Sequence, residues 1–153
     1  MLLYPNAKIN IGLNITSKLK SGYHSIESCF CPVSLYDIIE IKESNKNNFS
    51  TSGITIDGKK SNNIVHKAIK IFSSDKKLNI HLHKIIPIGA GLGGGSSNGS
   101  SILKFLNNKF PKYNQKELLS ESNKIGSDCP FFIHNKIKYV TGTGDIFEEI
   151  KID

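Results

Sequence analysis

The amino-acid sequence predicts an α+β fold in a single domain. The chain has 153 residues, which is enough for one domain with a sizeable core and too few for two comfortable ones. Segments with strand periodicity and segments with helix periodicity follow one another irregularly, and no linker divides the chain. This irregular order favours an α+β architecture over a doubly wound parallel sheet.

The clearest strand pattern covers residues 7–15, where apolar and polar side chains alternate strictly. One face of this pattern carries only apolar residues, namely Ala7, Ile9, Ile11, Leu13 and Ile15. The alternation therefore predicts a half-buried strand, whose other face carries Lys8 and Asn10. Residues 78–83 alternate again and predict another strand. Further strands are predicted at residues 25–33 and 37–43, and a strand, a turn and a strand over residues 136–152.

Apolar side chains at helical spacing predict three helices. These helices are expected at residues 62–73, from near residues 96–98 onward, and at residues 115–124. Residues 44–62 form the most polar stretch of the chain and predict a surface loop around Asp57 and Gly58.

The chain is basic but lacks the features of a nucleic-acid reader. Its net charge is +7, and all twenty basic residues are lysine. Arginine makes the commonest specific contact to guanine, and these lysines are scattered rather than gathered with aromatic residues. We therefore expect no nucleic-acid partner, and an anionic small molecule fits the positive charge equally well.

Cysteine content and hydropathy bear on the cellular compartment. The three cysteines, Cys29, Cys31 and Cys129, are an odd and sparse set, so no disulfide framework is expected. No apolar run approaches the length of a membrane span, and residues 1–5 are too short for a signal peptide. These features predict a cytoplasmic protein without a membrane partner.

The densest motif is the glycine-rich segment at residues 87–99, Pro-Ile-Gly-Ala-Gly-Leu-Gly-Gly-Gly-Ser-Ser-Asn-Gly. It follows a strand pattern and precedes a helix pattern, an arrangement in which backbone N–H groups and the helix dipole bind phosphate. Ser96 and Ser97 can cap the helix or donate to phosphate oxygens and a bound Mg²⁺. A plain surface turn rarely needs six glycines, so the segment predicts a phosphate-binding loop.

Other motifs match the same segment weakly. Gly89-x-Gly91-x-x-Gly94 fits the dinucleotide fingerprint, but no acidic residue stands at the end of a following strand. Gly95-x-Ser97-x-Gly99 fits the nucleophile elbow of hydrolases, but a long loop separates this serine from the strand. The P-loop pattern fails, because no lysine follows the glycines.

Four segments of the chain form an ordered set of motifs. They are Pro-Asn-Ala-Lys-Ile-Asn at residues 5–10, Gly-Tyr-His at 22–24, the glycine-rich run at 87–98, and Gly-Ser-Asp-Cys-Pro-Phe-Phe at 126–132. In this order they resemble the motifs of the GHMP-type small-molecule kinases, and the glycine-rich run is the most specific. The resemblance covers essentially the whole chain, but only about the N-terminal half of the family's usual length.

The resemblance implies a GHMP kinase N-terminal domain over residues 1–153, similar to domain 2 of ribosomal protein S5, with a mixed sheet and helices packed on one side. It also implies ATP and Mg²⁺ as cofactors. Within the family the motifs are most similar to those of members that phosphorylate cytidine diphosphate methylerythritol in isoprenoid biosynthesis. The C-terminal domain is expected to be absent, so we expect poor activity from the chain alone and a separate C-terminal half or a homodimer as partner.

The resemblance assigns roles only where residues match. Lys8 and Asp128 stand at the catalytic lysine and aspartate, and Asn10, Tyr23 and His24 stand at substrate-binding positions. Asn62 matches a position in the adenine pocket. The phosphate-binding positions are Pro87, Ile88, Gly89, Ala90, Gly91, Leu92, Gly93, Gly94, Gly95, Ser96 and Ser97.

Plainer interpretations stay open at this stage. A lysine on the polar face of a strand is usually solvated, and an aspartate before Cys129 and Pro130 can simply begin a turn. His81 and His83 share a strand face without a third metal ligand, so we expect them to be exposed. A non-catalytic nucleotide-binding remnant of a GHMP kinase and a dinucleotide-dependent reductase remain as alternative functions.

Overall fold

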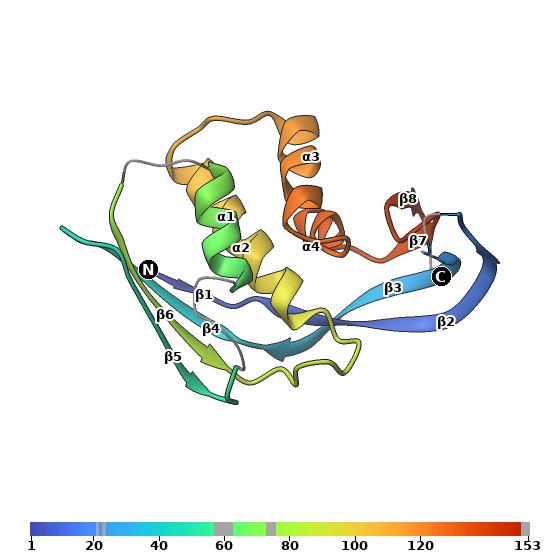
Figure 1. Ribbon diagram of the computed structural model, residues 1–153, viewed down its shortest axis with the longest axis horizontal. Coiled ribbons are helices and arrows are strands. Elements are labelled where there is room, and N and C mark those ends of the chain that lie inside the picture. Colours follow the sequence, from blue (N-terminus) through green and yellow to red (C-terminus); the bar gives the residue numbers. More distant parts are fainter. Residues whose placement is uncertain (21, 23, 57–62, 73–75, 151–153) are drawn as a thin grey trace.

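The chain folds into two four-stranded sheets with all of its helices on one side of them (Figure 1). The computed structural model describes residues 1–20, 22, 24–56, 63–72 and 76–150. The strands are β1 (Leu2–Leu3), β2 (Asn6–Lys18), β3 (His24–Tyr36), β4 (Ile38–Glu43), β5 (Asn48–Gly53), β6 (Leu78–Lys84), β7 (Lys138–Thr141) and β8 (Ile146–Glu149). The helices are α1 (Ile64–Phe72), α2 (Gly94–Lys109), α3 (Gln115–Ile125) and α4 (Cys129–His134).

The strand order explains why this architecture is α+β and not doubly wound. One sheet has the order β1-β4-β6-β5, in which β5 runs parallel to β6 and the other pairs are antiparallel. The second sheet has the order β2-β3-β7-β8 and is antiparallel throughout. The predicted mixed sheet with helices on one side is confirmed, although the strands divide into two sheets.

Two apolar clusters hold the layers together. The larger cluster lies between the first sheet and helices α1, α2 and α3, and its fully buried side chains include Ile39, Ile80, Leu82, Val65, Ile102, Leu103 and Leu106. The smaller cluster joins the second sheet to α4 through Phe30, Phe131, Phe132 and Val140. Burial of apolar surface is the dominant favourable term in folding, so these two clusters fix the helices on the sheets.

Asp37 occupies the corner at which the chain passes from one sheet to the other. It follows β3 of the second sheet and precedes β4 of the first sheet, and its side chain is fully buried. Its backbone N–H donates to the carbonyl oxygen of Pro5 at 2.9 Å, just before β2 begins. The corner therefore ties the starts of β2 and β4 together.

β2 differs from its predicted burial. The strand is present and longer than expected, but Ile9, Ile11, Leu13 and Ile15 of the apolar face are 40% to 60% exposed. Lys8, on the supposed solvent face, is only 4% exposed. The reason is that Lys8 and Asn10 share a sheet face with Phe30, the partner of Asn10 in β3, and α4 packs on Phe30.

A register shift also breaks the alternation that the sequence shows. The pairing of β2 with β3 slips between Ile11 and Leu13, where Gly12 has a φ of 69°. An inserted residue of this kind exchanges the two faces of a strand beyond it. The five apolar residues of β2 therefore do not lie on one continuous face.

Three elements were not predicted from the sequence, namely β1, β5 and α4. β5 lies inside the polar segment that predicted a loop, and it pairs with β6 over its whole length. α4 has six residues and a proline in its first turn, so it is too short to show helical periodicity. The loop expected around Asp57 and Gly58 lies outside the described residues.

No helix among the described residues combines the length and the apolar character needed to cross a membrane. The longest one, α2, has sixteen residues and carries buried serine, asparagine and glycine.

Gly53 is predicted to be far less replaceable than Gly12, although both have a φ near +70° to +80°. A Cβ at Gly53 would overlap the carbonyl oxygen of Lys84, whereas a Cβ at Gly12 meets nothing within 4 Å. Gly12→Ala should therefore lower the free energy of unfolding by about 1–2 kcal/mol, the cost of left-handed backbone alone. Gly53→Ala should cost clearly more, measured by urea denaturation, and equal losses in the two variants would contradict the overlap.

Candidate active site

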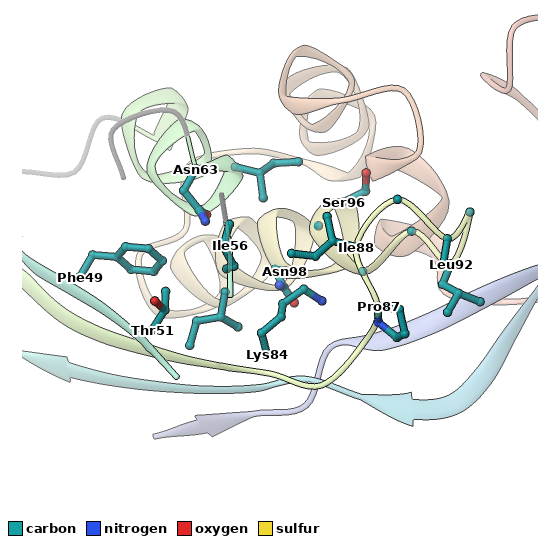
Figure 2. Close-up of a pocket in the computed structure, with 18 residues that line it drawn as sticks. Phe49, Thr51, Ile56, Asn63, Lys84, Pro87, Ile88, Leu92, Ser96 and Asn98 are labelled. Atoms are coloured by element: carbon teal, nitrogen blue, oxygen red, sulfur yellow. The ribbon is translucent and has the colours of Figure 1, made fainter. Parts of the chain in front are cut away.

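A cavity of about 770 Å³ opens between the first sheet, α1, α2 and the glycine-rich segment. Its size is that of a typical small-molecule site. Phe49 and Thr51 of β5, Leu82 and Lys84 of β6, and Ile64 of α1 form part of its wall. Figure 2 shows Phe49 and Thr51 at one end of the cavity, Pro87 and Leu92 of the glycine-rich segment at the other, and Ile88 between them.

The glycine-rich segment leads from the end of β6 into α2, and α2 begins without a side-chain cap. Its N-cap residue is Gly93, with a φ of 67°, and no side chain accepts from its first N–H groups. The first N–H groups of a helix have no partner within the helix. These groups, together with the helix dipole, favour an anion at the start of α2.

Ten of the predicted phosphate-binding residues, Pro87 to Ser96, line this cavity. Ser97, a residue of α2, does not line the cavity, and it is buried and only 2% exposed. The helix begins at Gly94, a little earlier than expected. Neither serine caps the helix. Asn62 lies outside the described residues, and its neighbour Asn63 lines the cavity.

The glycines of this segment are required for different reasons. Gly89 and Gly91 have φ values of 75° and 73°, and a Cβ on either would meet nothing within 4 Å. A Cβ on Gly93 would come within 2.8 Å of the Phe132 ring. A Cβ on Gly94 would come within 2.8 Å of Lys84 Nζ. Glycine at positions 93 and 94 therefore permits the start of α2 to pack closely against the rest of the protein.

A buried ion pair supports the first residues of the glycine-rich segment. Lys84 Nζ donates to Asp37 Oδ2 at 2.7 Å and to the carbonyl oxygen of Ile86 at 2.6 Å. Asp37 Oδ1 accepts from the backbone N–H groups of Ile85 and Ile86 at 2.7 and 2.8 Å. The two side chains are 3% and 0% exposed. A charge this deeply buried requires such complete pairing.

Lys8 and Asp128, predicted as a catalytic pair, lie together although they are far apart in the sequence. Lys8 Nζ is 3.6 Å from Asp128 Oδ2, with the lysine side chain 5% exposed and the aspartate 30% exposed. Lys8 Nζ also donates to Asn10 Oδ1 at 2.6 Å and lies 4.3 Å from the centroid of the Phe30 ring. The cation is thus fixed, while the carboxylate remains accessible.

The catalytic candidates adjoin the glycine-rich segment. The backbone N–H of Lys8 donates to the carbonyl oxygen of Leu92 at 3.0 Å. Leu92 lines the cavity and precedes the start of α2. A group held at the helix terminus would therefore lie close to the Lys8–Asp128 pair.

The substrate-binding candidates are only partly brought together. Asn10 contacts Lys8 directly. His24 is exposed at the start of β3 and pairs with Lys18 at the far end of the β2–β3 ribbon. Among the described residues, no interaction joins His24 to Lys8, Asn10 or Asp128. Tyr23 lies outside the described residues.

Several cavity residues were missed from the sequence. They are Phe49, Thr51, Ile56, Asn63, Ile64, Leu82, Lys84 and Asn98. Asn98 follows Ser97 in the glycine-rich run, so its place in the sequence could have predicted that it lines the cavity. The others lie on β5, β6 and α1 or beside them, and the pairing of β5 with β6 brings the strand residues among them to one wall.

The structure also bears on the alternative motifs. Ser97 is buried inside α2, which does not suit the exposed nucleophile of a hydrolase elbow. Burial raises the pKa of the Cys129 thiol to about 11, so this neighbour of Asp128 is not a ready nucleophile either. His81 and His83 are partly buried rather than exposed and contact Ser50 and Ser52. The described residues hold no cluster of three metal-binding side chains.

Comparisons with known proteins identify relatives along the whole chain. A family model for the GHMP kinases N terminal domain matches residues 63–136. The 4-diphosphocytidyl-2-C-methyl-D-erythritol kinase of Azobacteroides pseudotrichonymphae genomovar. CFP2 is 46% identical over 100% of this chain and 59% of its own length. The same-named kinase of Parabacteroides distasonis is 42% identical over 99% of this chain and 58% of its own length.

Solved structures show the same relationship. A crystal structure of 4-(cytidine 5'-diphospho)-2C-methyl-D-erythritol kinase superposes on 100% of this chain and 56% of its own, with a TM-score of 0.82 and 26% identity. The mevalonate kinase of Methanococcus jannaschii, at 16% identity and a TM-score of 0.69, shares the fold. The chain therefore spans little more than half the length of the relatives that it matches.

The Lys84–Asp37 pair is predicted to be a large contributor to stability. Removing one partner leaves an uncompensated buried charge, so Lys84→Met and Asp37→Ala should each lower the free energy of unfolding by about 3–5 kcal/mol. Asp37→Ala should cost more, because Asp37 also accepts from two backbone N–H groups. The measurement is urea denaturation.

The matched control is Glu43→Gln, which breaks the exposed ion pair of Glu43 with Lys109. An exposed pair contributes about 0–1 kcal/mol. A loss from Lys84→Met that is no larger than the loss from Glu43→Gln would contradict the role given to the buried pair.

Proposed function

We propose that the chain belongs to the GHMP kinase family and that it supplies the ATP-binding and catalytic residues of a small-molecule kinase. The kinase transfers the γ-phosphoryl group of ATP to the 2-hydroxyl of 4-diphosphocytidyl-2-C-methyl-D-erythritol. The substrate is proposed from the relatives of that name, which are 41% to 46% identical to this chain. The site residues are proposed from the geometry above.

The observation that carries the proposal is the junction of two sites. The uncapped start of α2 favours the phosphates of a nucleotide, and the cavity beside it has the size of a small-molecule site. The hydrogen bond between Lys8 and Leu92 holds the Lys8–Asp128 pair next to this helix terminus. Phosphoryl transfer needs little more from a protein than this positioning of charges and donors.

The chemistry assigns one role to each side chain. Asp128, the more accessible member of the pair, accepts the proton of the substrate hydroxyl. The hydroxyl oxygen bonds to the γ-phosphorus while the bond from that phosphorus to ADP breaks. Lys8 holds the carboxylate in place and offsets the negative charge of the transferring group. Asn10, hydrogen-bonded to Lys8, orders the lysine and the substrate.

Mg²⁺ is proposed to enter together with ATP. The described residues offer no cluster of three acidic or histidine side chains, so the ATP phosphates would supply most of its oxygen ligands. Ser96 lines the cavity, and we assign its hydroxyl as the protein group that completes the set. When bound, the ion neutralises part of the charge on the phosphates.

The apolar end of the cavity suits the adenine base. Phe49, Ile56, Ile64 and Leu82 line this part of the wall, and Asn63 stands beside them. A base in contact with these residues would direct its phosphates toward the start of α2. The cytidine substrate would extend along β2 and β3 toward His24.

The direct test is ADP release from Mg-ATP with and without the cytidine substrate. We expect release that depends on that substrate. ATP binding without any substrate-dependent release would instead favour the non-catalytic nucleotide-binding alternative, and tight NAD binding would revive the reductase.

Asp128→Asn is predicted to retain ATP affinity and to lose turnover by about a hundred- to ten-thousand-fold, because the amide cannot act as a general base. The measurement combines titration calorimetry with the ADP assay. Glu43→Gln is the control, since it alters another lysine-paired carboxylate that is exposed and does not line the cavity. Unchanged turnover in Asp128→Asn would remove Asp128 from the mechanism.

Gly95→Leu tests the phosphate-binding loop without disturbing the fold. A Cβ at Gly95 points into open space, with its nearest neighbour, Ile64 Cγ2, at 4.0 Å, and the residue is helical. Stability should not fall, because leucine favours helix over glycine by nearly 1 kcal/mol. ATP affinity should fall about tenfold or more, because the side chain occupies the cavity. Asn108→Leu, at an exposed position near the other end of α2, is the control; equal affinities in both variants would place the phosphates elsewhere.

A further inference from the structure

Asn98 has hydrogen-bonding capacity that the protein does not use. It lies in the second turn of α2, is 1% exposed, and lines the cavity. Its Oδ1 is buried and accepts no hydrogen bond, and it is the only such side-chain oxygen or nitrogen found in the part of the chain that the structure describes. Buried polar atoms nearly always have partners, so this exception requires an explanation.

The neighbouring polar group does not satisfy Asn98. Lys84 lies beside it in the close-up (Figure 2), but Lys84 Nζ donates to Asp37 and to the carbonyl oxygen of Ile86, and none of its hydrogen bonds reaches Asn98 Oδ1. An unpaired buried acceptor destabilises the folded state, because it has lost its hydrogen bonds to water and gained none in return. An apolar side chain of similar shape would avoid this cost, so the folded protein alone gains nothing from the amide.

The position of Asn98 indicates what its partner is. In Figure 2 it lies between the end of the cavity marked by Phe49 and Thr51 and the glycine-rich segment marked by Ile88 and Leu92. If phosphates are bound at the start of α2 and the base lies at the apolar end, Asn98 faces the part of the nucleotide that joins them. A half-turn of its amide exchanges the acceptor and the donor, so either can face the cavity.

We propose that the amide of Asn98 hydrogen-bonds the nucleoside part of the bound nucleotide and contributes to the choice of that nucleoside. The inference rests on the proposed ATP-binding function. Two groups of ATP share the required chemistry. One is the adenine edge, whose N6 donor and N7 acceptor match an asparagine amide, and the other is a ribose hydroxyl.

Asn98→Leu separates this role from a structural one. The variant removes an unpaired polar atom, so its melting temperature without nucleotide should equal or exceed that of the wild-type protein. Its ATP affinity should fall about tenfold, which corresponds to one good hydrogen bond. Its affinity for inorganic tripolyphosphate should not change, because the phosphates are bound by the glycine-rich segment. Titration calorimetry measures both affinities.

Ser100→Ala is the matched control on the same helix. Ser100 is fully buried, but its hydroxyl donates to the carbonyl oxygen of Cys129 at 2.9 Å. This variant should therefore lower the melting temperature and leave the ATP affinity of the folded protein unchanged. The expected effects of the two variants are opposite, which a general loss of packing could not produce.

Two ATP analogues identify the group that Asn98 contacts. If it is the adenine edge, ITP should bind the wild-type protein more weakly than ATP, and Asn98→Leu should abolish that difference. If it is a ribose hydroxyl, 2′-deoxy-ATP should show this behaviour instead. Wild-type ATP affinity in Asn98→Leu would overturn the inference alone, whereas failure of the wild-type protein to bind ATP would overturn the proposed function and the inference together.

Discussion

The buried ion pair of Lys84 with Asp37 is the interaction on which the candidate site depends. Asp37 stands at the corner between the two sheets, and Lys84 is the last residue of β6. Their side chains, with the backbone of Ile85 and Ile86, close a set of four hydrogen bonds where the chain leaves the sheet. The glycine-rich segment therefore begins from a fixed point, although its own residues carry few anchoring side chains.

The same point connects the two halves of the proposed chemistry. From this anchor the chain passes over the cavity to Leu92, where its carbonyl oxygen accepts from Lys8 of the other sheet. The strand wall of the cavity thus belongs to the first sheet, whereas Lys8 belongs to the second sheet and Asp128 to the N-cap of α4. A phosphoryl group held between the cavity and the Lys8–Asp128 pair would be aligned by both. Such alignment of the reacting groups is what phosphoryl transfer requires of a protein.

Part of this arrangement could be predicted, because it depends on residues that are neighbours in the sequence or on the order of the motifs. The strand, glycine-rich segment and helix follow one another in the chain, and the motif order indicated that Lys8 and Asp128 belong together. The burial of Lys8 was not predictable, because it depends on which face of β2 meets α4. β5 was missed because its serines and threonine resemble a loop, and the cavity wall was missed with it. Nothing in the sequence distinguishes Asp37 and Lys84 from exposed charged residues, because their burial and pairing depend on the tertiary fold.

The density of glycine in the segment follows from several demands that coincide there. Gly89 and Gly91 allow left-handed backbone where the segment turns. Gly93 and Gly94 allow the start of α2 to approach Phe132 and Lys84. Gly95 leaves open space in the cavity. The first two demands position the helix terminus and the third keeps it accessible, so a single run of glycines both places the uncapped start of α2 and leaves open space beside it.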